Sequence, residues 1–416
     1  MTGSGPYDVI VVGGGPAGAA AILHARRLSL RVLLLDKARF PRDKTCGDAL
    51  SGRSVTELRT LGLLDEVRAL PGATIRRVVF GGPSGQTASI PPLPSDQPAS
   101  SASPGPMAIE GYVVPRLHLD ALLFDRARAA ADHCLEGFAV RDLVREDGRV
   151  VGVTGQAAGG TASEFRGRVV LGCDGFGSVV ARRTGLYRHQ PEHSMVAIRC
   201  YHEGVAGLDD QIELHFLDEV LPGYFWIFPA GQGRANVGIG MNHADLTRRG
   251  IDLRQALARV LDSPRFRDRF RAARPLEKPT GWNLPVGSTR RPVCGEGFLL
   301  LGDAAGLIDP FTGEGIGNAL CSARLAVETA AEACAAGDFS ARFLRRYENR
   351  LWEALGRELA TSTRLHGLAR RRWLVDFVIR KAARRPEVSA AIAAMMLNAD
   401  DRRQLLGPRF YLGLLR

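Results

Sequence analysis

The chain has 416 residues, of which 45% are apolar and 24% charged, a composition typical of a folded globular protein with a sizeable core. The net charge of +11 gathers at the C-terminus, because residues 341–416 hold 16 arginines and one lysine against 7 acidic residues. The remainder is nearly neutral, and no RNA-reading fold accompanies the arginines. We therefore expect no nucleic-acid partner.

The seven cysteines are scattered and form no CxxC pair, which argues against a disulfide framework and against a zinc site. The N-terminus lacks the basic, apolar and small-residue succession of a signal peptide, and no run of 18 apolar residues is present. We expect a protein of the reducing cytoplasm.

The first strong pattern is the β-branched run at residues 7–12, which predicts a buried parallel strand. A glycine-rich turn at residues 13–18 follows, then an alanine-rich helix to about Leu28 and a second strand over residues 31–35. Together they form a strand–helix–strand unit.

The glycines of this unit match a turn that binds a dinucleotide. Gly13 allows the tight turn, Gly15 lets the backbone approach a pyrophosphate, and Gly18 lets the helix pack closely on the strand. The helix N-terminus offers N–H groups to phosphates, and Asp36 stands where a carboxylate accepts from ribose hydroxyls. The sequence predicts a dinucleotide site; the alternative is a purely structural unit.

The middle of the chain predicts further strands at residues 149–153 and 168–171, and a helix over residues 117–133. Residues 91–106 contain six prolines and four serines, so they form a loop that is either a surface excursion or a lid. From Leu320 onward the pattern is helical.

A second glycine-rich region lies late in the chain. A buried strand at residues 298–301 leads into Gly302-Asp303, a pair that resembles the ribityl-binding turn of FAD monooxygenase-type folds. The loop 310–318 opens a helix near Asn318, whose N-terminus would set backbone donors beside the flavin N1–C2=O edge. The alternative is an ordinary turn.

Three longer motifs resemble the geranylgeranyl reductase family of FAD-dependent oxidoreductases, within the p-hydroxybenzoate hydroxylase-like flavoprotein superfamily. They are the Cys-Gly-Asp stretch at residues 36–50, the aromatic stretch at 222–229 with its continuation at 235–240, and Gly-Asp-Ala-Ala-Gly at 302–306. The resemblance spans roughly residues 7–325. It implies tightly bound FAD and reduction of isolated C=C bonds in prenyl chains of chlorophyll, archaeal lipids or quinones, although bacterial members of secondary metabolism act on other substrates.

The motifs and the resemblance together give the predicted FAD-binding residues, in which Asp174-Gly175 resembles the Asp-Gly turn of the superfamily. They are Gly13, Gly15, Pro16, Ala17, Gly18, Asp36, Lys37, Cys46, Gly47, Asp48, Arg116, Asp174, Gly175, Asp303, Gly313, Gly315 and Ile316. The alternative for Arg116 is a surface charge at a helix end.

The resemblance also implies the catalytic candidates Cys46, Tyr224 and Trp226. Cys46 would lie near the isoalloxazine and position or protonate the alkene; the alternative is a buried small hydrophobic side chain. Residues 223–228 predict a strand with Tyr224, Trp226 and Phe228 on one face, which either roofs the flavin or belongs to the sheet core. The histidines show no metal-ligand spacing, and we predict no metal site.

The leading hypothesis is an FAD-dependent reductase of C=C bonds in an isoprenoid or other apolar substrate, with NAD(P)H or a ferredoxin-like protein as a transient electron donor. A monooxygenase is the alternative. A halogenase is disfavoured, because such enzymes need an active-site lysine and no lysine lies between Lys44 and Lys278. Residues 370–381 predict an interfacial helix for peripheral membrane contact; the alternative is a helix packed on the flavin domain.

We predict an α/β fold: a Rossmann-type FAD-binding domain, an inserted antiparallel β-sheet substrate domain and a C-terminal helical region. The predicted segments are 1–70, 111–185 and 281–335 for the FAD-binding domain, 71–110 (with its Pro/Ser-rich loop) and 186–280 for the substrate domain, and 336–416 for the basic helical region.

Overall fold

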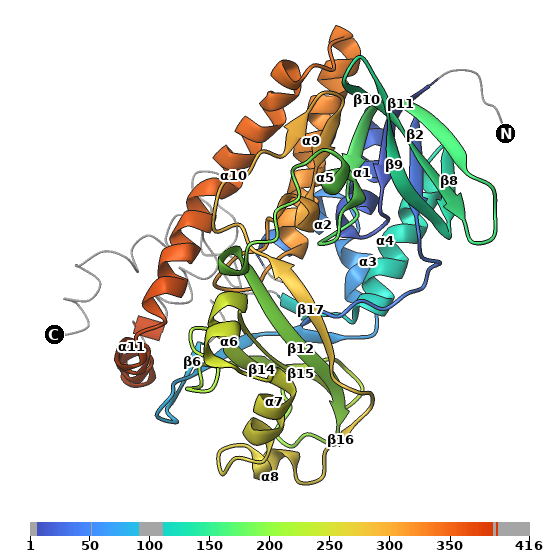
Figure 1. Ribbon diagram of the computed structural model, residues 1–416. Helices are drawn as coiled ribbons and strands as arrows, with labels where there is room; N and C mark the ends of the chain where they lie inside the picture. Colours follow the sequence, from blue (N-terminus) through green and yellow to red (C-terminus); the bar gives the residue numbers. More distant parts are fainter. Residues whose placement is uncertain (1–5, 51, 91–110, 386–387, 390–416) are drawn as a thin grey trace, which may run out of the picture.

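A computed structural model describes residues 6–50, 52–90, 111–385 and 388–389, so the predicted proline-rich loop lies outside the described residues. Two eight-stranded sheets form the upper and lower parts of the molecule in Figure 1, with a long C-terminal helix running beside both. The predicted α/β fold is confirmed, whereas the segment boundaries given above stay predictions.

The first sheet is built around the glycine-rich unit. Its parallel core follows the order β19, β11, β1, β2, β8, with β18 antiparallel to β19 and a β9–β10 ribbon extending β11. The strands are β1 (Tyr7–Val12), β2 (Val32–Asp36), β8 (His133–Glu136), β9 (Phe138–Glu146), β10 (Arg149–Ala157), β11 (Ser163–Gly172), β18 (Cys294–Gly295) and β19 (Phe298–Leu300).

Helices cover this sheet because its parallel strands are apolar on both faces. Every residue of β2 is buried, and α1 packs against both α4 and α9. The helices are α1 (Pro16–Arg27), α4 (Arg116–Ala130), α5 (Val179–Arg183) and α9 (Ile316–Ala336), with a short 3₁₀ turn η2 (Gly302–Ala305) leading toward α9.

The second sheet carries the aromatic motif in its middle. Its order is β16, β12, β15, β14, β13, β5, β6, and β17 pairs with β12. The strands are β5 (Arg77–Gly81), β6 (Thr87–Ile90), β12 (Ser194–Glu203), β13 (Gln211–His215), β14 (Tyr224–Pro229), β15 (Arg234–Asn242), β16 (Arg274–Pro275) and β17 (Thr280–Pro285).

Side chains of β14 alternate between the two faces of this sheet, as predicted. Phe225 and Ile227 pack in a cluster with Leu257 and Val260, whereas Trp226 and Phe228 belong to a cluster on the opposite face. The outer face is covered by α6 (His243–Arg249), α7 (Leu253–Leu261) and α8 (Arg267–Phe270), which Figure 1 shows beside the sheet; η1 (Pro191–His193) precedes β12. The face with Trp226 is therefore free to line a cavity.

A small third sheet joins the two large ones just after the Cys-Gly-Asp motif. It follows the order β3 (Ala49–Leu50), β7 (Gly111–Val113), β4 (Ala73–Ile75). Helices α2 (Arg53–Thr60) and α3 (Leu64–Arg68) lie between β3 and β4 in the chain, and α2 packs on α9.

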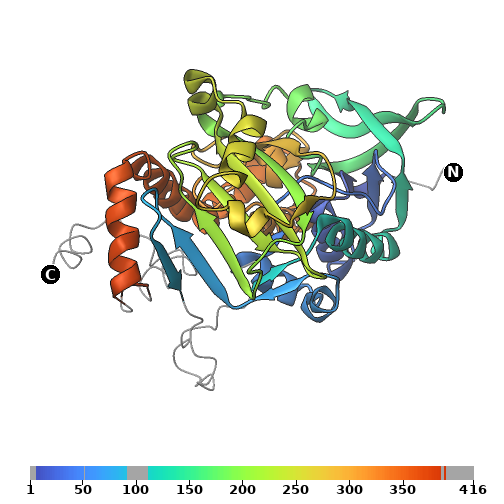
Figure 2. The same ribbon diagram turned by 90° about the horizontal axis from the view of Figure 1, so that it is seen from below.

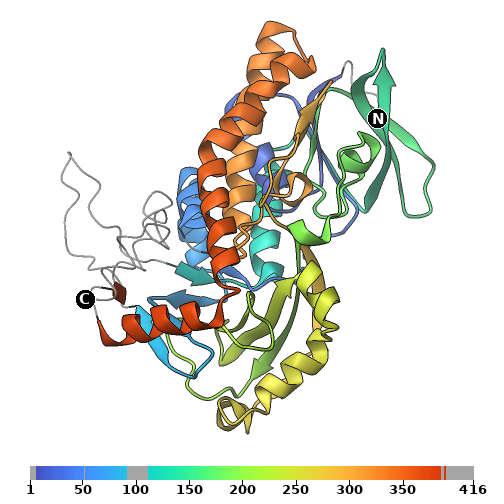
Figure 3. The ribbon, with the colours of Figure 1, turned by 60° about the vertical axis from the view of Figure 1, so that its left-hand side comes forward.

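The C-terminal helices correct one expectation. After α10 (Ala341–Leu368), α11 (Arg372–Arg384) packs against β6 of the second sheet, as Figures 2 and 3 show. The Asp376 carboxylate is buried there and accepts hydrogen bonds from Ser84 and Gln86. Packing of this helix on the flavin domain, the alternative given above, is therefore wrong, because its buried acid finds donors on the β5–β6 hairpin.

The helix predicted over residues 117–133 ends earlier, at Ala130. Asp132 instead accepts a hydrogen bond from the Val32 N–H at 2.8 Å, and His133 begins β8 beside β2. In the described part of the chain, no helix is both long and apolar enough to span a bilayer.

Candidate functional site

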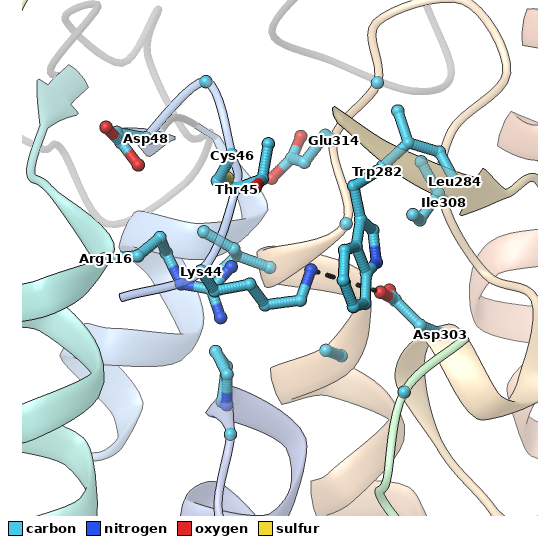
Figure 4. Close-up of a pocket in the computed structure, with 18 of the residues that line it drawn as sticks. Lys44, Thr45, Cys46, Asp48, Arg116, Trp282, Leu284, Asp303, Ile308 and Glu314 are labelled. Carbon is cyan, nitrogen blue, oxygen red and sulfur yellow. Dashed lines mark ion pairs between the residues drawn. The ribbon is translucent and has the colours of Figure 1, made fainter. Parts of the chain in front are cut away.

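A cavity of about 970 Å³ is lined by residues of both large sheets, and Figure 4 shows its centre. Of the predicted site residues, all but Gly18 line it: Gly13, Gly15, Pro16, Ala17, Asp36, Lys37, Cys46, Gly47, Asp48, Arg116, Asp174, Gly175, Tyr224, Trp226, Asp303, Gly313, Gly315 and Ile316. Residues as far apart in the sequence as Gly13 and Ile316 thus line one cavity.

The glycine-rich turn is shaped by close backbone contacts. Gly13 has a φ of +101°, and a Cβ on Gly18 would lie 1.8 Å from the Gly13 carbonyl oxygen. A Cβ on Gly15 would meet only the Arg42 guanidinium, at 3.5 Å. Gly18 therefore keeps α1 close to the strand, whereas Gly15 leaves open space on the cavity side of the turn.

Asp36 closes the turn from β2. Its carboxylate accepts hydrogen bonds from the Gly14 N–H at 2.6 Å and the Ala38 N–H at 2.7 Å. These two bonds fix the carboxylate at the edge of the cavity, and α1 begins beside it at Pro16 without a side-chain cap. Backbone N–H groups at such a helix start bind phosphates.

Arg116 is buried, so the alternative of a surface charge is wrong. Its guanidinium donates to both Asp120 oxygens, at 2.6 and 2.8 Å, and Arg42 donates to the same carboxylate at 2.6 Å. Burial alone would raise the pKa of Asp120, but Arg116 and Arg42 hold it below its usual range. Two cations against one carboxylate leave net positive charge beside the glycine-rich turn.

Lys44 crosses the centre of the cavity, as Figure 4 shows. Its ammonium lies 3.9 Å from an Asp303 oxygen and 5.0 Å from the centre of the Trp282 ring. Burial lowers the pKa of Lys44, and Asp303 partly offsets that effect. Lys44 is therefore no solvated loop charge: it connects the segment before Cys46 to the Gly302-Asp303 turn and to β17.

Asp174 follows β11 and lies against Gly13 of the glycine-rich turn. Its Oδ2 accepts from the Val179 N–H at 2.6 Å, while its buried Oδ1 has no hydrogen-bond partner among the described residues. Burial raises the pKa of this carboxyl. An orphaned polar atom in a cavity wall is what a ligand hydroxyl or a water molecule would satisfy.

One side of the cavity, here called the apolar wall, consists of side chains of β4, β5, β6, β13, β14 and nearby turns. Its members are Ile75, Val78, Phe80, Ile90, Ile212, Leu214, Phe216, Tyr224, Trp226, Phe228 and Phe311. Phe216 lies 6.2 Å from both Tyr224 and Phe311, ring centre to ring centre. The Tyr224 hydroxyl donates to the Thr312 carbonyl at 2.7 Å, which ties the wall to the loop that opens α9.

Cys46 is half-buried and lies between Arg116 on one side of the cavity and the apolar wall on the other. The Cys46 thiol interacts electrostatically with the Arg116 guanidinium. Gly47 packs against the apolar wall, since a Cβ there would lie 3.3 Å from the Phe228 ring. Cys46 thus borders both a cationic and an apolar surface, and its catalytic role stays a prediction.

Several cavity residues were not predicted from the sequence. Arg199 of β12 is fully buried, pairs with Asp43 at 2.6 Å and also with Glu277, and lies over the Tyr201 ring. The sequence did offer a signal for Arg199, because a charged residue at an inward position of an apolar strand is unusual. Trp282 carried no such signal, because β17 reaches Lys44 only through the tertiary fold.

No group of side chains that could hold a metal ion occurs among the residues that the structure describes. His215 is buried against Glu213 and Arg265, and His193 contacts Ser288. These contacts indicate structural roles.

Three features fit FAD in particular: the open side of Gly15, the cations Arg42 and Arg116 beside the turn, and the uncapped starts of α1 and α9. The helix starts and the cations would hold the pyrophosphate and the flavin ring edge. Asp36 and Gly315 line the same cavity, so these donors could hold one dinucleotide between them.

Comparisons with known proteins agree with this geometry. The FAD binding domain family model matches residues 6–351. The digeranylgeranylglycerophospholipid reductase 2 of Methanothermobacter thermautotrophicus is 33% identical over 370 residues, which cover 86% of each chain. The menaquinone reductase of Mycobacterium tuberculosis is 35% identical over 335 residues, covering 77% of this chain and 76% of that protein.

Solved structures share the fold. A geranylgeranyl bacteriochlorophyll reductase-like protein of Thermoplasma acidophilum superposes with a TM-score of 0.82 at 24% identity, covering 96% of this chain and 98% of that one. A flavin-dependent brominase variant gives a TM-score of 0.75 at 21% identity, with the same coverage. The matched domain, the relatives and the motifs together show that this chain belongs to the geranylgeranyl reductase family of FAD-dependent oxidoreductases.

Proposed function

We propose that the protein is an FAD-dependent reductase of C=C bonds in an isoprenoid or other apolar unsaturated substrate. The observation that carries this proposal is that one cavity is lined both by the glycine-rich turn and by the apolar wall. An apolar chain lying on this wall would reach the space beside Cys46 without leaving the cavity. Two relatives are named digeranylgeranylglycerophospholipid reductase and menaquinone reductase, and these names point to the same substrate class.

Bound FAD, once reduced, supplies the hydride for such a reaction. The chain's own residues would do the rest: Arg42 and the α1 start would bind the anionic pyrophosphate, and Asp303 would accept from the ribityl hydroxyls. Trp226 and Phe228 orient the alkene and exclude water, because both are buried in the apolar wall. Cys46, held near Arg116, is placed to position the alkene or to deliver a proton to it.

The test is a single-turnover reaction under anaerobic conditions. The purified protein, reduced chemically, is mixed with prenyl quinones and with prenyl glycerophospholipids, and the products are weighed by mass spectrometry. We expect products heavier by two hydrogen atoms per bond, formed faster than with free reduced flavin. A product that gains an oxygen atom in air, with no anaerobic reduction, would instead identify a monooxygenase.

The electron donor is a finer part of the proposal. We propose that NAD(P)H, or else a ferredoxin-like protein, reduces the flavin transiently. Support comes from the described residues, in which the GxGxxG spacing occurs once, at Gly13, Gly15 and Gly18, and this turn would be occupied by FAD. Bleaching of the flavin absorbance by NADPH or NADH, compared with a reduced ferredoxin, identifies the donor.

Peripheral membrane contact is the other finer part, and we place it on the outward face of α11. Trp373 is 65% exposed, and Arg371 and Arg380 are exposed beside it. Arg370 and Arg372 are less suited, because they pair with Asp245 at 2.6 Å and Asp218 at 2.8 Å. An exposed tryptophan among cations is typical of helices at anionic membrane surfaces.

Co-sedimentation with anionic vesicles tests this placement. We expect Trp373→Ala to weaken vesicle binding, whereas Trp282→Ala, which alters a partly exposed tryptophan at the cavity, should leave it unchanged. Equal binding by the wild type and the Trp373 variant, or no binding by either, would contradict a membrane role for α11.

A further inference from the structure

Asn236 is a fully buried amide on β15, the strand that pairs with the aromatic strand β14. Its neighbours Ala235 and Val237 pack in the apolar cluster on the other face of the sheet. Burying an amide costs free energy unless its polar atoms are hydrogen-bonded, so an apolar side chain would suit the sheet better at this position. The bonds that the amide makes are therefore the reason to look behind the cavity wall.

The amide binds three groups that come from two separate segments. Its nitrogen donates to the Cys46 carbonyl at 2.8 Å and to Asp48 Oδ2 at 2.7 Å. Its oxygen accepts from the Trp226 indole N–H at 3.0 Å. Because the Cys46 carbonyl only accepts and the indole N–H only donates, a single orientation of the amide satisfies both. Asn236 thus joins two catalytic candidates through one rigid group.

The strand of Asn236 also fixes the Trp226 ring at a second point. Trp226 pairs with Gly238, and a Cβ on that glycine would lie 2.2 Å from the ring atom Cζ2. The indole therefore lies directly against the Gly238 backbone, while its N–H is tied to Asn236 two residues earlier. A contact at the ring face and a hydrogen bond at the ring edge together restrict rotation of the side chain.

The bond to Cys46 fixes backbone that belongs to no regular element. Cys46 lies between the end of β2 at Asp36 and the start of β3 at Ala49. The Asn236 nitrogen holds the carbonyl of the same residue whose thiol borders the cavity. The position of the thiol relative to the Trp226 ring therefore depends on this one amide.

We propose that Asn236 is a positioning residue of the reductase site, whose amide holds the Cys46 segment and the Trp226 ring in place relative to one another. The inference rests on the proposed function, in which an alkene lies beside these two side chains. Asn236 itself does not line the cavity, so it acts through its two partners and not on the substrate. A misplacement of about 1 Å at a reacting centre can cost on the order of 100-fold in rate.

The first test follows the thiol without any turnover. The holoenzyme is treated with iodoacetamide, and peptide mass spectrometry measures how fast each cysteine is alkylated. Alkylation of Cys46 should be several-fold faster in Asn236→Ala, because the segment that carries the thiol loses an anchor. Cys134 is half-buried as well and serves as the internal reference, whose rate should not change.

Asn242→Ala is the matched control on the same strand. Asn242 is buried like Asn236, but its amide binds the Glu192 carbonyl and the Ala244 N–H. Its removal costs hydrogen bonds in the same sheet and leaves the Cys46 carbonyl bond intact. An equal rise of Cys46 alkylation in Asn236→Ala and Asn242→Ala would reflect general loosening of the sheet and would overturn the proposal.

The second test is a double-mutant cycle on turnover. We compare kcat per bound flavin, with KM, for the wild type, Asn236→Ala, Trp226→Phe and the double variant. Each single change should lower kcat about tenfold and change KM less, because one buried hydrogen bond is lost at the reacting centre. Phenylalanine has no N–H for Asn236 to hold, so the double variant should lose clearly less than the product of the two effects. Losses that simply multiply would overturn the proposal.

The two tests separate this inference from the proposed function. If the wild type reduces no prenyl substrate while Cys46 alkylation still depends on Asn236 and not on Asn242, the proposed function fails and the positioning of Cys46 stands. Should Asn236→Ala fail to fold, Asn236→Ser takes its place, because the shorter serine cannot bridge the same partners. A folded variant of either kind that keeps the wild-type rate of Cys46 alkylation overturns the proposal.

Discussion

The glycine-rich turn offers a graded test of FAD binding by single methyl groups. A Cβ on Gly18 would lie 1.8 Å from the Gly13 carbonyl oxygen, and that atom belongs to backbone rather than to a flexible side chain. Ordinary contact needs roughly 3.4 Å, so the turn and α1 must separate by about 1.6 Å, and overpacking of this kind costs about 3 kcal/mol. If the cost falls on the FAD-bound form, FAD affinity drops about 100-fold.

Gly15 and Gly367 provide contrasting positions for the same substitution. A Cβ on Gly15 meets only Arg42 at 3.5 Å, so Gly15→Ala should leave the protein as stable as the wild type while its methyl group crowds the phosphate. We expect FAD affinity to fall about tenfold, worth about 1.4 kcal/mol. Gly367 of α10 has no atom within 4 Å of its Cβ position, so Gly367→Ala should stabilise the helix by about 0.5–1 kcal/mol and leave FAD binding unchanged.

The assay is titration of FAD into the stripped protein, followed by flavin fluorescence quenching, with thermal unfolding measured on the same samples. The expected order of affinity is wild type equal to Gly367→Ala, then Gly15→Ala, then Gly18→Ala. Wild-type affinity in Gly18→Ala would refute the reasoning, because the turn would then tolerate a clash that the geometry forbids.

Three further predictions concern the buried charges and the apolar wall. Burial raises the pKa of Asp48 to about 6 from 3.8, so the folded protein binds this proton more tightly than the unfolded chain does. The free energy of unfolding should therefore fall by about 3 kcal/mol as the pH rises from about 4 to about 6. In urea unfolding across this pH range, the Asp48→Asn variant should show no such fall in unfolding free energy, whereas the Asp65→Asn control, at an exposed side chain, should show it. Arg116→Met strips Asp120 of its bidentate partner and should lower the unfolding free energy by about 3–5 kcal/mol, and an unchanged melting temperature would contradict the pair's importance. Ile212→Trp should narrow the cavity beside the apolar wall, and so slow turnover of long prenyl chains more than of short ones while FAD content stays unaltered. An equal effect on both chain lengths would argue against the apolar wall as the substrate site.

Local chemistry could be predicted from the sequence where the backbone itself imposes it. Gly13 is required by its positive φ and Gly18 by its contact with the Gly13 carbonyl five residues earlier. The shared face of Tyr224 and Trp226, opposite Phe225, follows from strand geometry. The FAD-binding assignment and the family followed from these motifs and were confirmed by the comparisons.

What escaped the sequence depends on contacts between distant segments. Arg199 meets Asp43 across 156 positions, and the Lys44–Asp303 pair joins residues 259 apart. The packing of α11 was misjudged for the same reason, because Asp376 finds its donors at Ser84 and Gln86 on a hairpin 290 residues earlier. Periodicity shows that a helix has an apolar face and does not show which surface covers it.

The measurement that tests the central claim most directly is the mass of the product formed by the chemically reduced protein from a prenyl quinone or prenyl phospholipid without oxygen. We expect a product heavier by two hydrogen atoms for each bond reduced, with stoichiometric reoxidation of the bound flavin. Unchanged substrate beside a flavin that stays reduced would contradict it.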